Sequence, residues 1–315
     1  MNIGQYCIYN FYIETLLTNK YVHEYFYYRF LGFRTKMDSI NSDLNIKQIS
    51  NIVSWSYSID KNDIMCDDYV KDSNDNYINI LDYKNYLIYD KKQRTIFVYI
   101  EDDNRFMEKV ISIRLVSLAI SLLMQKNIFC LHGACVEVQK NGILMMGNSG
   151  SGKTSLLLKC IEKNARITND DATFIKIKDG KFISLKNTQY FGLTQNGIGT
   201  DFPYMSDCVE FVDDNSKYRI DVGRVYEDIF ADYITIHTII WISSERAKIA
   251  DIHKIGYPDI IGRILKNGTV HNKVLFQEYV QNVVDLVLHC DNYELVPCNG
   301  LEETFKCLSQ TFDIE

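Results

Sequence analysis

The octapeptide GNSGSGKT at residues 147–154 constrains the fold of this chain more than any other stretch. It fits the pattern G-x-x-x-x-G-K-[ST], in which glycines let successive backbone N–H groups curve around phosphate oxygens. An apolar run (GILMM) precedes it and an amphipathic run (SLLLKCIEK) follows it. This strand–loop–helix order adds the positive end of a helix to the loop. The motif therefore predicts an α/β fold that binds a nucleotide.

The residue types of this loop predict which groups bind ATP and which bind Mg²⁺. Lys153 is expected to reach the β- and γ-phosphates, and the Thr154 hydroxyl is expected to ligate Mg²⁺. The backbone of the remaining residues is expected to surround the phosphates: Gly147, Asn148, Ser149, Gly150, Ser151 and Gly152.

Two adjacent acids, Asp170 and Asp171, lie 17 and 18 residues after Lys153. That interval accommodates a helix of about three turns, a turn and a short strand returning beside the P-loop strand. Both carboxylates are therefore expected at the phosphate site, one near Mg²⁺ and one accepting a proton. The alternative is a solvated turn. His132, 21 residues before Lys153, is by itself more typical of a core or surface residue.

Composition limits the partners. The net charge of −7 gives no general reason to expect nucleic acid or an anionic membrane. The most apolar stretch, residues 110–129, contains Arg114 and Lys126 and is too short between them to span a bilayer. The nine cysteines show no C-x-x-C pair, and the N-terminus has no secretory signal pattern. These features predict a cytoplasmic protein with reduced thiols.

The order of patterns predicts two parts. Residues 1–107 are expected to be a strand-rich α+β region that serves in substrate recognition, and residues 108–315 a P-loop domain. We expect a buried helix at 108–125, a central strand at 234–243, a helix ending at Gly268 and a closing helix near 301–310. The run VVDLVLHCDNYELVPC (283–298) is patterned like a strand.

Three features together resemble the HPr kinase/phosphorylase family. They are Leu131-His132-Gly133, the loop at 147–154, and Asn169-Asp170-Asp171. The resemblance is strong over about 40 residues and weaker toward the C-terminus, where SKYRI (216–220) is similar to a strand carrying Lys and Arg. It implies a P-loop kinase domain with a mixed sheet, similar in fold to phosphoenolpyruvate carboxykinase.

The resemblance also implies residue roles. Asp170 would be the general base that activates a Ser hydroxyl, and Asp171 with Thr154 would hold Mg²⁺. His132 would orient the transferred phosphoryl group, while Lys153 and the loop amides would bind phosphates. Lys217 and Arg219 are candidates for a further cation at the developing charge, against the alternative of a plain strand edge.

One departure concerns the reverse reaction. Members with phosphorylase activity carry a metal-binding Glu about 25 residues after the Asp pair, where this chain has Gln195 and Asn196. This difference places phosphorylase activity, and HPr as the acceptor, in doubt.

The sequence leaves several functions open. The leading hypothesis is an ATP-dependent kinase acting on a Ser or Thr hydroxyl of a peptide or small protein, such as a ribosomal natural-product precursor. The alternatives are a small-molecule kinase for an amino acid or sugar, and a nucleotide-binding regulatory NTPase. Carboxykinase-like chemistry ranks lower. A homo-oligomer is compatible with the resemblance, because HPr kinases form hexamers.

Overall fold

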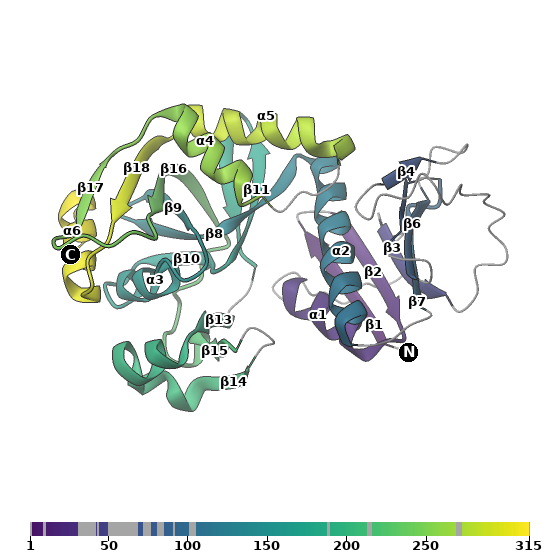
Figure 1. Ribbon diagram of the computed structural model, residues 1–315, viewed down its shortest axis with the longest axis horizontal. Helices are drawn as coiled ribbons and strands as arrows, with labels where there is room; N and C mark the ends of the chain where they lie inside the picture. The colour runs from purple at the N-terminus through teal and green to yellow at the C-terminus, as the bar shows by residue number, and fades with distance from the viewer. Residues whose placement is uncertain are drawn as a thin grey trace. The chain divides into compact units, whose positions relative to one another are not determined.

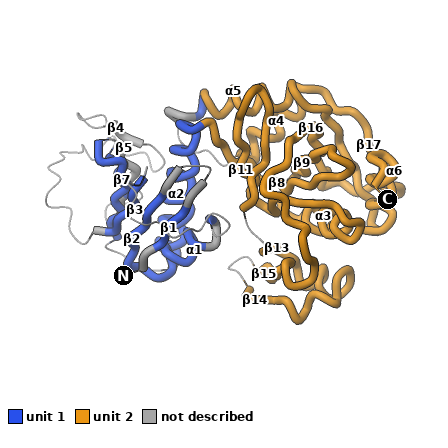
Figure 2. Tube along the Cα trace, turned by 180° about the vertical axis from the view of Figure 1, so that it is seen from behind, with its two compact units in different colours: residues 1–126, 270–277 blue, residues 127–269, 278–315 orange. Residues whose placement is uncertain are grey.

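A computed structural model describes most of the chain (Figure 1). The described residues are 2–8, 11–30, 42, 44–49, 69–71, 77–80, 85–90, 92–100, 105–187, 190–212, 216–268 and 273–314. They form two compact units, coloured separately in Figure 2. The first unit comprises residues 1–126 and 270–277, and the second comprises 127–269 and 278–315. The first unit therefore extends past residue 107, where composition placed the boundary.

The first unit contains a seven-stranded sheet in the order β1-β2-β3-β7-β6-β5-β4. The pairings of β3 with β2 and with β7 are parallel, and the remaining pairs are antiparallel. The strands are β1 (Asn2–Ile8), β2 (Phe11–Leu17), β3 (Leu44–Ile49), β4 (Tyr69–Lys71), β5 (Tyr77–Ile80), β6 (Asn85–Asp90) and β7 (Thr95–Ile100). The expected strand-rich character of this region is confirmed for its described residues.

Aromatic side chains of the first unit build its core. Helix α1 (Lys20–Phe30) places Phe26 and Phe30 with ring centroids 4.5 Å apart, and Tyr6 of β1 meets Phe26 edge-on at 5.5 Å. All three rings are buried, so they stabilise the unit by burying apolar area. The predicted helix at 108–125 is α2 (Arg105–Leu123), which is followed by the 3₁₀ turn η2 (Met124–Lys126) and contacts α1.

The second unit is built on an eight-stranded mixed sheet, as expected. Its order is β10-β8-β11-β12-β16-β18-β17, and β9 pairs with both β8 and β16. The strands are β8 (Ile128–Val138), β9 (Asn141–Gly147), β10 (Arg166–Asn169), β11 (Ala172–Lys178), β12 (Lys181–Leu185), β16 (Tyr233–Ile242), β17 (Asp251–Lys254) and β18 (Asp291–Val296). Only the β16 pairings with β9 and β18 are parallel. The predicted central strand is β16, which is almost wholly apolar because it is covered on both faces.

A smaller sheet in the same unit has the order β13-β15-β14. Its strands are β13 (Tyr190–Leu193), β14 (Val209–Val212) and β15 (Tyr218–Asp221), and all their pairings are antiparallel. A π-helical turn η3 (Gly197–Asp201) and the 3₁₀ turn η4 (Pro203–Cys208) lie between β13 and β14, and the 3₁₀ turn η5 (Val222–Arg224) follows β15.

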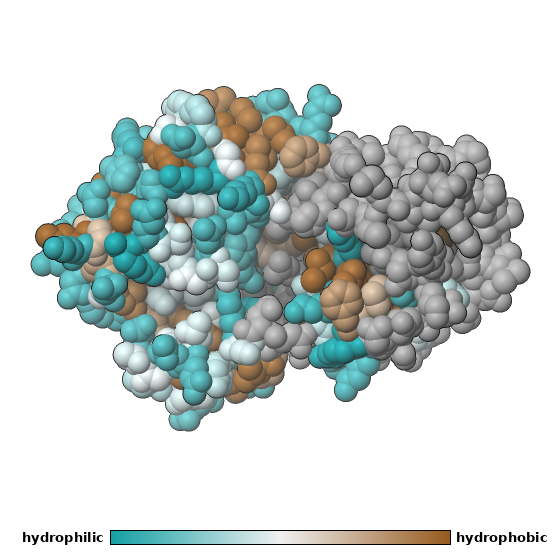
Figure 3. Space-filling model, viewed as in Figure 1, coloured by the Kyte–Doolittle hydropathy of each residue, from teal (hydrophilic) through white to brown (hydrophobic). Residues whose placement is uncertain are grey.

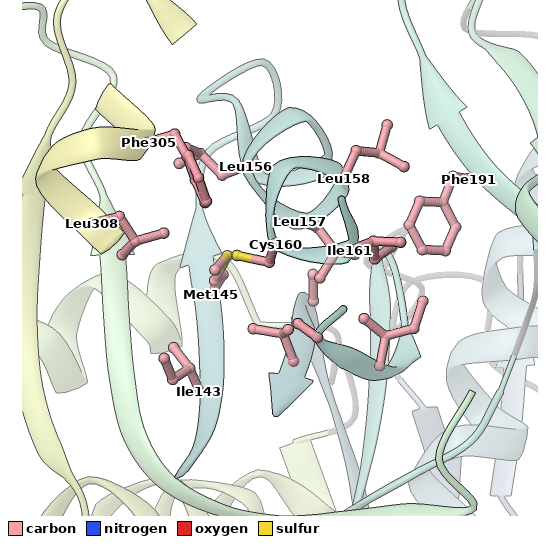
Figure 4. Packing of buried hydrophobic residues seen from close by; sticks show 14 of the residues in the cluster. Ile143, Met145, Leu156, Leu157, Leu158, Cys160, Ile161, Phe191, Phe305 and Leu308 are labelled. Carbon is pink, nitrogen blue, oxygen red and sulfur yellow. The ribbon is translucent and has the colours of Figure 1, made fainter. Parts of the chain in front are cut away.

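Helix α3 (Lys153–Ile161) covers the P-loop strand with its apolar face (Figure 4). Leu156, Leu157 and Cys160 of α3 meet Met145 of β9, and Phe305 of α6 (Leu301–Phe312) lies beside them. These side chains are buried. The packing fixes the start of α3, and with it the P-loop, on the end of β9.

The run at 283–298 is not a single strand, so that prediction was wrong. Residues up to His289 belong to α5 (Lys273–His289), and only 291–296 form β18. Val283, Leu286 and Val287 are fully buried and follow the i, i+3, i+4 spacing of a helix face. The valines of this run favour a strand, so the helical period was not recognised in the sequence. Helix α4 (Tyr257–Lys266) ends just before Gly268, near the position expected.

Within the described residues, no helix is long and apolar enough to cross a membrane. The visible face of the second unit mixes hydrophilic and hydrophobic residues (Figure 3). Exposed apolar side chains such as Ile249 and Leu288 occur among polar ones. The cysteines described are free thiols: Cys130, Cys135, Cys160, Cys208, Cys290, Cys298 and Cys307.

Candidate active site

The P-loop joins β9 to α3 through glycines that no other residue replaces without strain. Gly147, Gly150 and Gly152 have φ of 150°, 80° and 102°, a region that side chains with a Cβ avoid. A Cβ on Gly147 would also lie 2.5 Å from the carbonyl oxygen of Ile242 in β16. The loop therefore has the backbone geometry expected from the motif, pressed against the central strand.

Lys153 is held within the loop. Its Nζ donates to the carbonyl oxygens of Gly147 at 2.7 Å and Asn148 at 3.0 Å. Burial lowers the pKa of Lys153, and the charges of Asp170 and Asp171 oppose that effect. The ammonium thus has oxygen partners in a largely buried position, and phosphate oxygens would satisfy the same donors.

The Ser151 hydroxyl is a second buried polar group of the loop. Its Oγ has no hydrogen-bond partner among the described residues, although Ser151 is only 3% exposed. A buried hydroxyl without a partner carries a desolvation cost. Together with the curved loop backbone and Lys153, this donor fits an anionic ligand on the loop.

Asp170 lies directly against the P-loop helix. The Thr154 hydroxyl is 3.0 Å and 3.1 Å from its two carboxylate oxygens, and the Gly192 N–H donates to it at 3.3 Å. Burial raises the pKa of Asp170 above its ordinary value, and the charge of Asp171 adds to this effect. The hydrogen bonds from Gly192 and Thr154 and the charge of Arg219 act in the opposite direction. A carboxylate in this setting is a stronger proton acceptor than an exposed one.

Asp171 has different neighbours. Its carboxylate lies 3.1 Å from His132 Nδ1 and 3.9 Å from Arg219 Nη2. All three side chains remain about one-fifth to one-quarter exposed. Asp171 also adopts a left-handed backbone conformation, with φ of 71°. Consequently the two acids point to different partners although they are adjacent in sequence.

The short strand β10, which ends just before the Asp pair, does not lie beside the P-loop strand as expected. β10 pairs with β8, not with the P-loop strand β9, which lies between β8 and β16. The spacing from Lys153 correctly indicated that the Asp pair lies close to the P-loop. It did not specify which strand β10 would pair with. The alternative of a solvated turn does not hold at Asp170, which is 2% exposed.

The small sheet brings the two candidate cations to the site. Gly192 of β13 pairs with Arg219 of β15, and a Cβ at Gly192 would lie 3.0 Å from Arg219 Nη1 and 3.2 Å from Lys217 Cδ. The positive charge of Lys217 also contributes to lowering the pKa of Lys153, after the larger effect of burial. Lys217 and Arg219 are thus assembled with the Asp pair and the P-loop.

The Thr154 hydroxyl is the group that would bind Mg²⁺ in this structure. Among the described residues, no group of three or more His, Cys, Asp or Glu side chains has the arrangement of a metal site. Mg²⁺ needs few protein ligands when phosphates and waters complete its shell. Thr154 lies against Asp170, whereas Asp171, its expected partner, faces His132 and Arg219.

Sequence reasoning missed the contributions of four residues. Gly192 supplies a backbone donor to Asp170, and Asn169 and Thr173 bond to each other beneath the Asp pair. Arg246, which follows β16, makes a long hydrogen bond of 3.5 Å to the Ser151 carbonyl. Gly192, Thr173 and Arg246 belong to no motif, and Asn169 entered only as the first residue of the Asn169-Asp170-Asp171 motif, so the N-D-D-x-T run at 169–173 carried the signal.

Comparison with known proteins agrees with this geometry. Residues 124–193 match the model of the HPr Serine kinase C-terminal domain. That segment contains His132, the P-loop, the Asp pair and Gly192. The P-loop region is HPr kinase-like. Lys217 and Arg219 lie beyond the matched segment.

Individual relatives also match a part of the chain. An HPr kinase/phosphorylase of Clostridium beijerinckii is 45% identical over 116 residues, and one of Clostridium botulinum (strain Eklund 17B) is 32% identical over 116 residues. Each match covers 31% of this chain and 38% of the relative. The solved Hpr(Ser) kinase/phosphatase from Coxiella burnetii is 13% identical, with a TM-score of 0.32, over 58% of this chain and 95% of that one.

Proposed function

We propose that this protein is an ATP-dependent kinase that transfers a phosphoryl group to a Ser or Thr hydroxyl of a peptide or small protein. The observation that carries the proposal is the convergence of Asp170 and Thr154 at the start of the P-loop helix. A buried carboxylate with a raised pKa beside a phosphate-binding loop suits acceptance of a proton from an attacking hydroxyl. The HPr kinase-like sequence of the same segment supports this reading.

In this reaction the acceptor oxygen forms a bond to the γ-phosphorus, and the bond from that phosphorus to the β-phosphate oxygen breaks. The acceptor proton passes to Asp170, and ADP leaves. Lys153 and the loop N–H groups would hold the phosphates, while His132 and Arg219 would stabilise the transferred group. In such reactions catalysis comes mostly from positioning and charge stabilisation, so this set suffices.

Mg²⁺ would neutralise phosphate charge at Thr154. The resemblance to HPr kinases gives the second protein ligand as Asp171, which leaves Asp170, hydrogen-bonded to Thr154, as the general base. The two assignments differ in their consequences, because loss of a metal ligand weakens Mg·ATP binding and loss of a general base does not.

The acceptor class follows from the relatives, which are HPr kinase/phosphorylases by name. We extend that class to peptides, with a ribosomal natural-product precursor as the leading case. The stretch around Gln195 and Asn196, at the end of β13, has no Glu, which supports a kinase without the phosphorylase reaction. Residues 1–107 are the proposed acceptor-recognition part.

The test is incubation of the protein and Mg·ATP with the short peptides and small proteins encoded beside its gene. Mass spectrometry would detect a phosphate adduct of about 80 Da on a Ser or Thr. An adduct absent from the Asp170→Asn variant would support the proposal. ATP turnover with no modified peptide would overturn the peptide acceptor and favour a small-molecule acceptor or a switch.

A further inference from the structure

The Asp pair stands on a sharp turn between two strands that share one neighbour. Asn169 at the end of β10 lies opposite Cys135 of β8, and Ala172 at the start of β11 lies opposite His132 of the same strand. Asp170 and Asp171 therefore lie where the pairing with β8 is interrupted, just after a register shift between Ile167 and Asn169. Asp171 has a positive φ, which costs energy in a residue other than glycine. Surrounding contacts must hold such a turn in place.

A side-chain bridge closes this turn from beneath. The Thr173 hydroxyl lies 2.7 Å from Asn169 Oδ1, so one residue before the pair is joined to a residue two positions after it. Both residues have no exposed surface. Since water does not reach the bridge, it has no ready substitute for these hydrogen bonds.

The same hydroxyl connects the turn to the strand that carries His132. Thr173 Oγ1 is 2.9 Å from the Gly133 carbonyl oxygen. A hydroxyl has one proton, so it donates to one of its two neighbouring oxygens at a time. The Gly133 N–H in turn donates to the Asp171 carbonyl oxygen at 3.2 Å. Thr173 thus lies at the meeting point of the Asp turn and the His132 strand.

The other end of the bridge is anchored in the sheet. The Asn169 side-chain amide donates to Thr168 Oγ1 at 2.9 Å and to Ser184 Oγ at 3.1 Å. Thr168 and Ser184 are also fully buried, with hydroxyls in contact with each other. A buried polar network with its members bonded to one another is rigid, and that rigidity passes to the turn.

We propose that Asn169 and Thr173 are positioning residues that fix the orientation of Asp170 and Asp171 for phosphoryl transfer. Their side-chain hydrogen bonds go to neighbouring residues of the sheet and not to either carboxylate, so they act through the backbone of the turn. An apolar pair of the same size would fill this space equally well. The polar bridge supplies a directional restraint that such a pair lacks. The catalytic consequence rests on the proposed kinase function.

The test compares Thr173→Val, which keeps the side-chain shape, with Thr173→Ser, which restores the hydroxyl. Thr173→Val is expected to lower kcat about 10²-fold, the effect of a displacement near 1 Å, while Mg·ATP affinity stays within about twofold. Thr173→Ser is expected to recover most of the wild-type rate. Asn169→Ala, at the other end of the bridge, should reproduce the loss if Thr173→Val fails to fold.

A second readout does not depend on activity. Hydrogen exchange at the amides of Gly133, Ala172 and Gly192 should accelerate on the order of tenfold in Thr173→Val, since the turn loses a restraint. Thr238→Val is the matched control. Thr238 is a buried threonine bonded to Asn141 Oδ1, and it pairs with Ile143 in the first half of β9, away from the P-loop end. It should leave kcat and exchange at the three amides unchanged.

The outcomes separate the two proposals. If the wild-type protein modifies no acceptor, the kinase proposal fails and the exchange comparison alone decides the role of the bridge. Unchanged exchange at all three amides in Thr173→Val would overturn the positioning role whatever the activity. A rate loss that Thr173→Ser does not restore would also overturn it, because volume and not the hydroxyl would then matter.

Discussion

Two adjacent carboxylates have different environments in this protein. Asp170 is buried against Thr154 and the Gly192 N–H, and Asp171 is partly exposed between His132 and Arg219. Different surroundings give two like groups different proton affinities, which is how one site separates acid–base work from charge stabilisation. Their separation comes from the turn, because the left-handed Asp171 directs its side chain away from that of Asp170.

Replacing Asp170 tests this separation at the residue scale. Asp170→Asn is expected to lower phosphoryl transfer by at least about 10²-fold, the usual effect of losing a general base. Mg·ATP affinity, measured by calorimetry, should change little. The control is Asp179→Asn, at the exposed turn between β11 and β12, which should leave both quantities unchanged. An equal loss of affinity and rate would identify Asp170 as a metal ligand or structural residue.

At the scale of elements, the P-loop depends on contact with a neighbouring strand. Gly147 lies against β16, where Ile242 is its partner in the parallel pairing, whereas Gly150 has open space around it. Position 147 requires glycine both because a Cβ would clash with β16 and because φ is positive. Position 150 requires glycine because φ is positive, and a Cβ there would meet no neighbouring atom.

This difference predicts unequal costs. Gly150→Ala should lower the free energy of unfolding by about 1 kcal/mol, from the positive φ alone. Gly147→Ala should cost about 3 kcal/mol and abolish nucleotide binding, since a clash with backbone is added to the strain. Denaturant titration of the full chain, following the unfolding of the second unit with and without Mg·ATP, measures both the free energy of unfolding and the loss of nucleotide binding. Equal costs for the two variants would contradict the contact with β16.

The small sheet is a second element that acts on the site. Its strand β15 carries Arg219 to Asp171, and β13 contributes Gly192. Arg219→Ala is expected to lower kcat about 10²-fold with the KM for ATP nearly unchanged, because charge stabilisation matters most in the transition state.

The matched control for Arg219 lies in the same region. Arg224 is largely exposed and forms ion pairs with Glu210 and Asp221. Arg224→Ala should leave steady-state kinetics unchanged. If Arg219→Ala instead raises KM alone, Arg219 binds the nucleotide or acceptor in the ground state.

At the scale of the whole molecule, all the candidate site residues belong to the second unit. A ligand that binds only one unit stabilises that unit by mass action, by about 2.7 kcal/mol at 100 times its Kd. For a unit of this size the melting temperature should rise by about 5 to 10 °C. Mg·ATP should therefore shift one of two thermal transitions.

The two tryptophans make this measurable, because one lies in the sequence of each unit. In Trp55→Phe, fluorescence follows Trp241 of β16 in the second unit alone. That transition should shift with Mg·ATP in the wild type and stay fixed in Lys153→Ala. An equal shift in Lys153→Ala would contradict nucleotide binding at the P-loop.

The sequence determined those parts of the protein whose chemistry is local. The P-loop, the strand and helix around it, the central strand and the spacing of the Asp pair all follow from side-chain types within a few dozen residues. Glycine, lysine and threonine at fixed positions leave few alternatives, because backbone conformation and ligand chemistry act there together.

Tertiary structure decided what depends on contacts between distant segments. The placement of β10 beside β8, the approach of Gly192 to Asp170 and the Thr173 bridge to Gly133 join residues far apart in sequence or without any motif. The helical end of the 283–298 run was decided in the same way, by burial of one face against the core. Packing selects such pairings from many that local preference permits, so no pattern in the chain alone specifies them.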